Sequence, residues 1–105
     1  MIGHPVRVNE RFSDLRPGER VRVVKDSAWN GPWPAEPFGV IDPDADAPIR
    51  VLDLAAMPEV TVPDEDRGPM AEYLVRFDEP QLDGGGDGPY DSAVIWVKYL
   101  RRATP

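Results

Sequence analysis

Hydrophobic and polar side chains alternate in several short stretches of this chain, which is the pattern of strands that bury one face. An early example is the segment 16–25, RPGERVRVVK, in which a Pro-Gly turn precedes the alternation. Val21 and Val23 fall on one face of this segment, and Arg20 and Arg22 fall on the other. We therefore predict a half-buried strand that begins directly after the turn.

A second alternating stretch, 72–80, reads EYLVRFDEP and ends at Pro80. It places Tyr73, Val75 and Phe77 on one face. Aromatic and β-branched residues fit the pleated surface of a sheet, so this stretch is the strongest strand signal in the sequence.

Two short apolar runs predict further strands. Residues 38–41, FGVI, are too few for a helix and are followed by an Asp-Pro turn, and Gly39 within them indicates a bend or bulge. Residues 93–97, AVIWV, form the last predicted strand. Residues 98–102, KYLRR, follow it as one tight helical turn at the C-terminus.

The segment 42–70 is acidic and rich in proline, with two weaker apolar pieces at 49–54 and 60–62. On one interpretation these pieces extend a hairpin. On the other, the segment has too little apolar surface to offset the entropy of ordering, and its tip stays mobile. The sequence leaves both interpretations open.

About five short strands joined by irregular loops predict an all-β fold, a small and strongly bent antiparallel sheet that closes toward a barrel. We assign residues 1–15 to a leader and residues 16–105 to a single barrel domain, with 42–70 as a long acidic, proline-rich insertion. Strand alternation and the closing turn predict a core that holds Val21, Val23, Phe38, Val40, Val75, Phe77, Ala93, Ile95 and Leu100.

Composition narrows the class of protein further. The chain has 105 residues with 12 basic and 19 acidic side chains, a formal net charge of −7, and this length limits it to one compact domain. Nine glycines and thirteen prolines disfavour long helices. We expect a soluble, cytoplasmic protein without a membrane partner, because neither an apolar span nor a secretion signal is visible. The absence of cysteine excludes disulfides, thiolate metal sites and a cysteine nucleophile.

The order of four segments resembles a known family. PGERVRVV, FGVI, YLVRFDEPQLDGGG and DSAVIWVKYLRR are similar to the SH3-like barrel that forms the C-terminal domain of the nitrile hydratase beta subunit. Each segment alone is common, so their order and spacing carry the resemblance. The matching positions are Gly18 to Val23, Gly39 to Ile41, Tyr73 to Phe77, Asp91 to Val94, and Tyr99 with Leu100.

The resemblance implies a small SH3-like barrel of about five short antiparallel strands. It also implies an alternative role for the chain, as an accessory subunit or activator of a nitrile-hydratase-type enzyme. The catalytic metal of that family sits on cysteines of the alpha subunit. No catalytic residue, metal ligand or cofactor is therefore implied for this chain.

The loop 29–37, WNGPWPAEP, carries the candidate binding residues. Trp29 and Trp33 lie among three prolines, and a tryptophan offers a large contact area at low conformational cost. On one interpretation the two indoles form a platform for a peptide or another subunit, together with Phe38 and Tyr90. On the other interpretation they fold back as a lid over one open end of the barrel. Solvent exposure of the rings distinguishes the two.

Acidic side chains are weaker candidates. Three aspartates are spaced four apart through the glycine-rich loop 83–91, but the last ligand position of a calcium loop falls on Val94, where a glutamate is needed. Whether this loop binds a cation stays open. The carboxylates around Asp42 and at 64–66 are interpreted as solvated charge. His4 is the sole histidine and gives a Ser-His-Asp triad little support.

Arginines cluster in the first quarter of the chain and recur at its end, so a local basic patch is conceivable. The net charge of −7 nevertheless repels a phosphate backbone at long range. We therefore expect a non-catalytic protein-interaction or accessory module that uses its Trp/Pro-rich loop and whose partner is another protein. Nucleic-acid binding by a small barrel is the less favoured alternative.

Overall fold

The computed structural model describes residues 15–25, 33 and 35–103. Six strands and three short 3-10 helices make up its regular structure. The strands are β1 (Arg20–Val23), β2 (Phe38–Ile41), β3 (Arg50–Asp53), β4 (Pro69–Gln81), β5 (Tyr90–Trp96) and β6 (Leu100–Arg102), and the 3-10 helices are η1 (Leu54–Ala56), η2 (Asp64–Asp66) and η3 (Val97–Tyr99).

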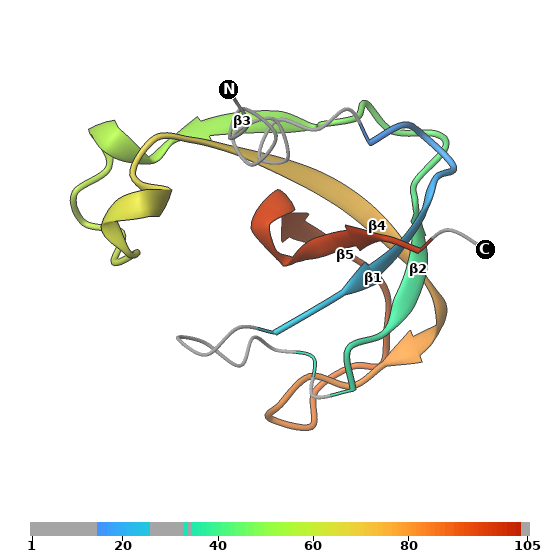
Figure 1. Cartoon of the computed structure of the whole chain (residues 1–105). Helices are drawn as coiled ribbons and strands as arrows, with labels where there is room; N and C mark the ends of the chain where they lie inside the picture. Colours follow the sequence, from blue (N-terminus) through green and yellow to red (C-terminus); the bar gives the residue numbers. More distant parts are fainter. Residues whose placement is uncertain (1–14, 26–32, 34, 104–105) are drawn as a thin grey trace.

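All strand pairs are antiparallel, and the long strand β4 is the centre of the sheet (Figure 1). One edge of β4 pairs with β5. The other edge pairs with β3 along its first part and with β2 along its second part. From β2 the sheet continues through β1 to β6, and it curls so that β1 and β6 pass in front of β4 and β5 in Figure 1.

The predicted all-β fold is confirmed. The strands β1, β2, β4, β5 and β6 follow one another in the order of an SH3-like barrel, with a 3-10 turn before the last strand. The additional strand β3 belongs to the insertion. The predicted helical turn is present, but its bounds differ from 98–102: η3 covers Val97–Tyr99, and the next three residues pair with β1. Leu100 lies opposite Val23, and this pairing holds the end of the chain in an extended conformation.

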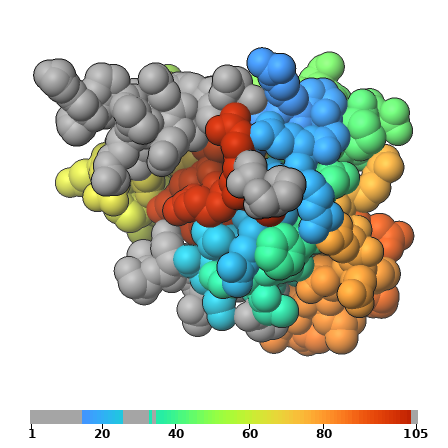
Figure 2. All heavy atoms as spheres, turned by 45° about the vertical axis from the view of Figure 1, so that its right-hand side comes forward, coloured from blue at the N-terminus to red at the C-terminus, as the bar shows by residue number. Residues whose placement is uncertain are grey.

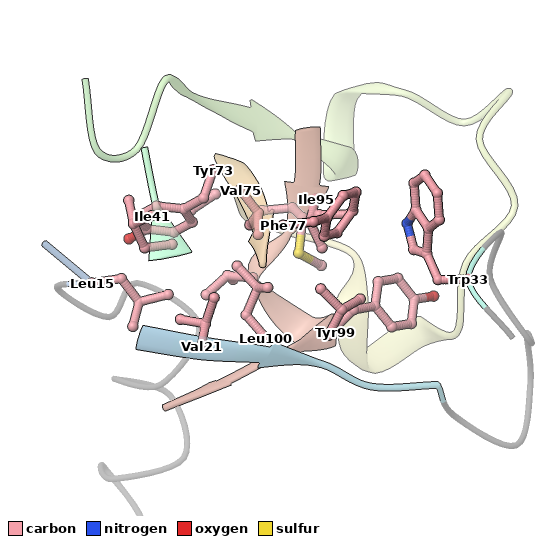
Figure 3. Packing of buried hydrophobic residues seen from close by; sticks show 14 of the residues in the cluster. Leu15, Val21, Trp33, Ile41, Tyr73, Val75, Phe77, Ile95, Tyr99 and Leu100 are labelled. Carbon is pink, nitrogen blue, oxygen red and sulfur yellow. The ribbon is translucent and has the colours of Figure 1, made fainter. Parts of the chain in front are cut away.

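The hydrophobic core extends from Leu15 at one end to Trp33 at the other (Figure 3). Tyr73, Val75 and Ile41 are almost completely buried between these ends. Six of the nine predicted core residues are buried: Val21, Val23, Val75, Phe77, Ile95 and Leu100.

The prediction is wrong for Phe38 and Val40, whereas Ala93 packs against the core from its edge. Phe38 is 43% exposed, and the other two are half-buried. In β2 the opposite face points inward, so that Gly39 and Ile41 are buried instead.

The reason lies in the close approach of β2 to β4. A Cβ atom on Gly39 would lie 2.4 Å from the carbonyl oxygen of Arg76 and 3.0 Å from Cγ1 of Val75. Only a glycine fits there, and once it faces inward the period of two places Phe38 on the outer face.

The insertion 42–70 packs against the core and is held by side-chain hydrogen bonds. The guanidinium of Arg67 donates hydrogen bonds to three backbone carbonyl oxygens, those of Leu54 (3.1 Å), Met57 (3.0 Å) and Val60 (2.5 Å). Leu54 is fully buried, and Met57 and Val60 pack against the core. Of the two apolar pieces, the first forms β3 (Arg50–Asp53), which pairs with β4 as a hairpin, whereas residues 60–62 form no strand.

Candidate interaction surface

Trp33 lies inside the end of the barrel rather than on its surface. Its ring centroid is 4.9 Å from that of Phe77 and 5.8 Å from that of Tyr90, both in edge-to-face geometry. The side chain is 6% exposed, and its Nε1 is buried without a hydrogen-bond partner among the described residues. Figure 3 shows the indole closing one end of the core beside Phe77 and Tyr99. This is the position that the lid interpretation expects for Trp33, whereas Trp29 lies outside the described residues.

Glu36 anchors the end of the loop between β1 and β2 to residues at the end of β1 and just after it. Its carboxylate accepts hydrogen bonds from the backbone N–H of Lys25 (2.8 Å) and from the guanidinium of Arg22 (3.2 Å). The backbone of Glu36 has φ 51°, a left-handed conformation that is unusual for a residue other than glycine. The backbone N–H of Val23 also donates to the carbonyl oxygen of Pro37 (2.8 Å), so side-chain and backbone hydrogen bonds join the two ends of the loop that contains Trp33.

Tyr90 covers Trp33 from the outside. It is the first residue of β5 and pairs with Gln81 of β4, beyond a register shift in the ladder. It is 41% exposed, so part of the ring packs on Trp33 while the rest meets solvent. The structure thus brings together two of the predicted binding residues, one buried and one exposed.

Phe38 lies on the outer face of the sheet between two arginines of β1. The Cζ atoms of Arg20 and Arg22 lie 5.7 Å and 5.4 Å from the centroid of the Phe38 ring, within the range of cation–π attraction. Both arginines point outward because Val21 and Val23, which alternate with them, point into the core. The result is a partly exposed aromatic ring flanked by two guanidinium groups, which we call the Phe38 patch (Arg20, Arg22 and Phe38).

Each arginine of the Phe38 patch also has an acidic neighbour. Nη1 of Arg20 lies 2.8 Å from Oδ1 of Asp78, and Nη2 of Arg22 lies 3.2 Å from Oε1 of Glu36. Figure 2 shows the blue atoms of β1 and the teal atoms before β2 on the same face as the orange atoms near the end of β4. Phe38 belongs to this outer face, while Trp33 and Tyr90 belong to the end of the barrel.

The glycine-rich loop after β4 uses one of its aspartates to hold its own backbone. Oδ1 of Asp83 accepts hydrogen bonds from the backbone N–H groups of Gly85 and Asp87, each at 2.9 Å. Across residues 15–25, 33 and 35–103, no three His, Cys, Asp or Glu side chains gather in a group that could hold a metal ion. The geometry of this loop is that of a self-capped turn.

Three buried carboxylates are the polar sites that sequence reasoning missed. Asp42 is 8%, Asp66 2% and Glu72 7% exposed, so the interpretation of Asp42 and Asp66 as solvated charge is wrong. Asp42 accepts hydrogen bonds from Arg76 at 3.1 and 3.2 Å. Glu72 accepts one from Nε1 of Trp96 at 3.1 Å and one from the guanidinium of Arg50.

These carboxylates were missed because each partner is distant in the sequence. Arg76 is 34 residues from Asp42, and Trp96 is 24 residues from Glu72. The only signal in the sequence was that Glu72 begins the strongest alternating stretch, which indicates a place within a sheet. In each case the contacts satisfy a desolvated charge that would otherwise destabilise the fold.

An open depression lies beside the turn that precedes β1. It is lined by Arg16, Pro17, Gly18, Glu19 and Arg102. The carboxylate of Glu19 accepts hydrogen bonds from the backbone N–H of Arg16 (2.9 Å) and from Nε of Arg102 (2.5 Å). Glu19 and Arg102 therefore neutralise each other, whereas Arg16 is held through its backbone.

In comparisons with known proteins, no family model, curated protein or solved structure matched the chain. The resemblance to the nitrile hydratase beta subunit, and the accessory role that it implies, therefore stay predictions. Within the described part of the chain, no helix combines the length and apolar character needed to cross a membrane.

Proposed function

We propose that this chain is a non-catalytic protein-interaction module whose recognition surface combines the Phe38 patch with Tyr90. The observation that carries the proposal is the position of Phe38, a large aromatic ring that is 43% exposed and held between two guanidinium groups. Aromatic residues and arginine are enriched at protein interfaces and among the residues that dominate binding energy.

A binding partner can replace the acidic neighbours of the Phe38 patch. The side chains of Arg20 and Asp78 are 49% and 42% exposed, and an exposed pair of this kind contributes little to stability. A partner carboxylate can therefore replace Asp78 at small cost while a partner apolar side chain covers the Phe38 ring. The chemistry that fits the patch is an apolar group flanked by acidic groups.

Tyr90 is a second exposed aromatic contact residue, at the end of the barrel. Its ring is supported from below by the buried indole of Trp33, so it is held in place before any partner arrives. A rigid aromatic side chain loses little conformational entropy on binding, which favours affinity. In this proposal Trp33 supports a contact residue, and the loop of which it is part shapes the surface.

The charge arrangement favours a protein over a nucleic acid as the partner. Arg22 forms an ion pair with Glu36, Arg76 with Asp42, and Arg102 with Glu19, so the charge of each of these three arginines is matched by a carboxylate. Nucleic-acid affinity comes largely from the counterions that leave the phosphates when basic groups neutralise them. A chain with a net charge of −7 and paired arginines is poorly suited to this.

Affinity purification with three immobilised forms tests the proposal. The forms are the unaltered chain, Phe38→Ala, and Leu82→Ala as a control at another exposed apolar residue, which is 53% exposed. We expect a protein from the native cell that the unaltered chain and Leu82→Ala retain and Phe38→Ala loses. Identical retention by all three forms contradicts the proposal, as does retention of nucleic acid that falls steeply with salt.

A further inference from the structure

Within residues 15–25, 33 and 35–103, three strands of the sheet have an edge with no partner strand, and they differ in how that edge is protected. Among the described residues, β3, β5 and β6 each pair with a single neighbouring strand. Native proteins protect such edges with short strands and charged side chains, because an open edge is a template for another strand. β6 has three residues, two of them arginine, and β3 has four residues bounded by Arg50 and Asp53.

β5 lacks this protection. It is seven residues long, reads YDSAVIW, and has Asp91 as its one charged residue. Asp91, Ser92 and Val94 are exposed, and Val94 is 46% exposed. The stretch from Ser92 to Trp96 therefore presents an uncharged strand whose second edge has no partner strand in the described part of the chain.

The sequence of β5 is complementary to itself in one antiparallel register. When two copies are centred on Val94, Ser92 of each lies opposite Trp96 of the other, and Ala93 lies opposite Ile95. Each small side chain then faces a large one, and the two Val94 side chains meet at the centre, which is the kind of cross-strand pairing that stabilises sheets. The two Asp91 carboxylates fall at opposite ends of the ladder, so the register brings no like charges together.

We propose that the free edge of β5 pairs antiparallel with β5 of a second copy, joining the two sheets into one across a two-fold axis. The pairing is isologous, because the same residues contribute from both copies. A ladder this short buries a small area, so the dimer is weak and its population depends on concentration. This inference is separate from the proposed function, whose decisive residue, Phe38, belongs to β2.

Light scattering after size-exclusion chromatography tests the dimer on the full chain, from about 10 μM to about 1 mM. We expect the mass to rise from one chain toward two over this range. Val94→Lys places two ammonium groups opposite each other and should raise the dissociation constant at least about tenfold. Val51→Lys, at a residue of β3 that is 52% exposed, is the matched control and should leave the dimer unchanged. A single-chain mass at every concentration overturns the proposal, and so does an equal effect of the two lysine variants.

A cysteine variant maps the register independently of the lysine variants. The chain has no cysteine, so Val94→Cys introduces a single thiol. Because the proposed register places the two copies of residue 94 directly opposite each other, mild oxidation should link Val94→Cys into a disulfide-bonded dimer. Val51→Cys should remain largely monomeric under the same conditions. Failure of Val94→Cys to cross-link faster than Val51→Cys contradicts this register, and a monomer whose β5 instead binds an added extended peptide of different sequence shows that the edge serves another partner.

Discussion

Nζ of Lys98 lies 2.5 Å from Oδ2 of Asp66, and this ion pair joins η3 to η2 across 32 residues of sequence. The side chain of Asp66 is 1% exposed and that of Lys98 is 15% exposed, so both charges are largely removed from water. The tip of the insertion is thereby tied to the turn that closes the barrel. An acidic segment that resembles a solvated loop in the sequence is in this way a structural part of the domain.

Replacing one partner of this pair should destabilise the protein strongly. Asp66→Ala leaves the Lys98 ammonium desolvated without the carboxylate beside it, and we expect the free energy of unfolding to fall by about 3 kcal/mol. Urea denaturation followed by circular dichroism measures the change. Glu65→Ala, at the exposed neighbouring residue, is the matched control and should change the free energy by less than about 0.5 kcal/mol.

A double variant separates the ion pair from simple packing. Asp66→Leu combined with Lys98→Met replaces both charges with apolar groups, so neither member of the pair leaves the other's charge behind. We expect this double variant to be more stable than Asp66→Ala. If the double variant is the less stable of the two, packing or another contact of these side chains, rather than the charge pair, dominates at this place.

Arg67 should hold the insertion together through its three hydrogen bonds to carbonyl oxygens. Arg67→Ala removes all three, and hydrogen bonds from a charged donor contribute more than neutral ones, so we expect a loss of about 2 kcal/mol or more. Hydrogen exchange should become faster in residues 54–62 and stay unchanged in β1. Arg16→Ala, at an exposed arginine, should leave both regions unchanged. Uniformly faster exchange in Arg67→Ala would contradict a local role.

Gly39 should be intolerant of even a methyl group. In Gly39→Ala the added Cβ would lie 2.4 Å from the carbonyl oxygen of Arg76, which forces β2 and β4 apart. We expect a loss of at least about 2 kcal/mol and a decrease in Tm of at least about 8 °C. Gly68→Ala, where an added Cβ meets no atom within 4 Å, is the matched control and should change Tm little. Equal changes in Tm for the two variants would contradict the close approach of β2 to β4 as the cause.

The strands were predictable from sequence because their alternation is local information. Val21 and Val23 faced inward as the pattern indicated, and Arg20 and Arg22 faced outward. In β2 the pattern failed, because a four-residue run with Gly39 inside it is compatible with either face. The face of β2 that points inward is decided by the close approach of Gly39 to the carbonyl oxygen of Arg76 in β4. A local pattern carries no information about a neighbouring strand.

The candidate site was harder to predict for the same physical reason. The sequence identified Trp33 as notable but left open whether it was a platform or a lid. Its burial depends on Phe77 and Tyr90, which lie 44 and 57 positions further along the chain and reach it only once β4 and β5 have paired. The exposure of Phe38 likewise follows from the register of β2, so composition and periodicity alone could not place it.

Substitution of Trp33 should lower stability, whereas substitution of Phe38 should affect recognition and leave stability nearly unchanged. Trp33→Ala opens a cavity beside Phe77 and removes the support of Tyr90, so we expect the free energy of unfolding to fall by about 3 to 5 kcal/mol. Phe38→Ala removes a ring that is 43% exposed and should cost no more than about 1 kcal/mol, mostly from its contacts with Arg20 and Arg22. Thermal and chemical denaturation of the two variants give the comparison. The reverse order of stability would contradict the assignment of Trp33 to the core and of Phe38 to the surface, whereas the expected order means that any binding lost by Phe38→Ala comes from the surface itself.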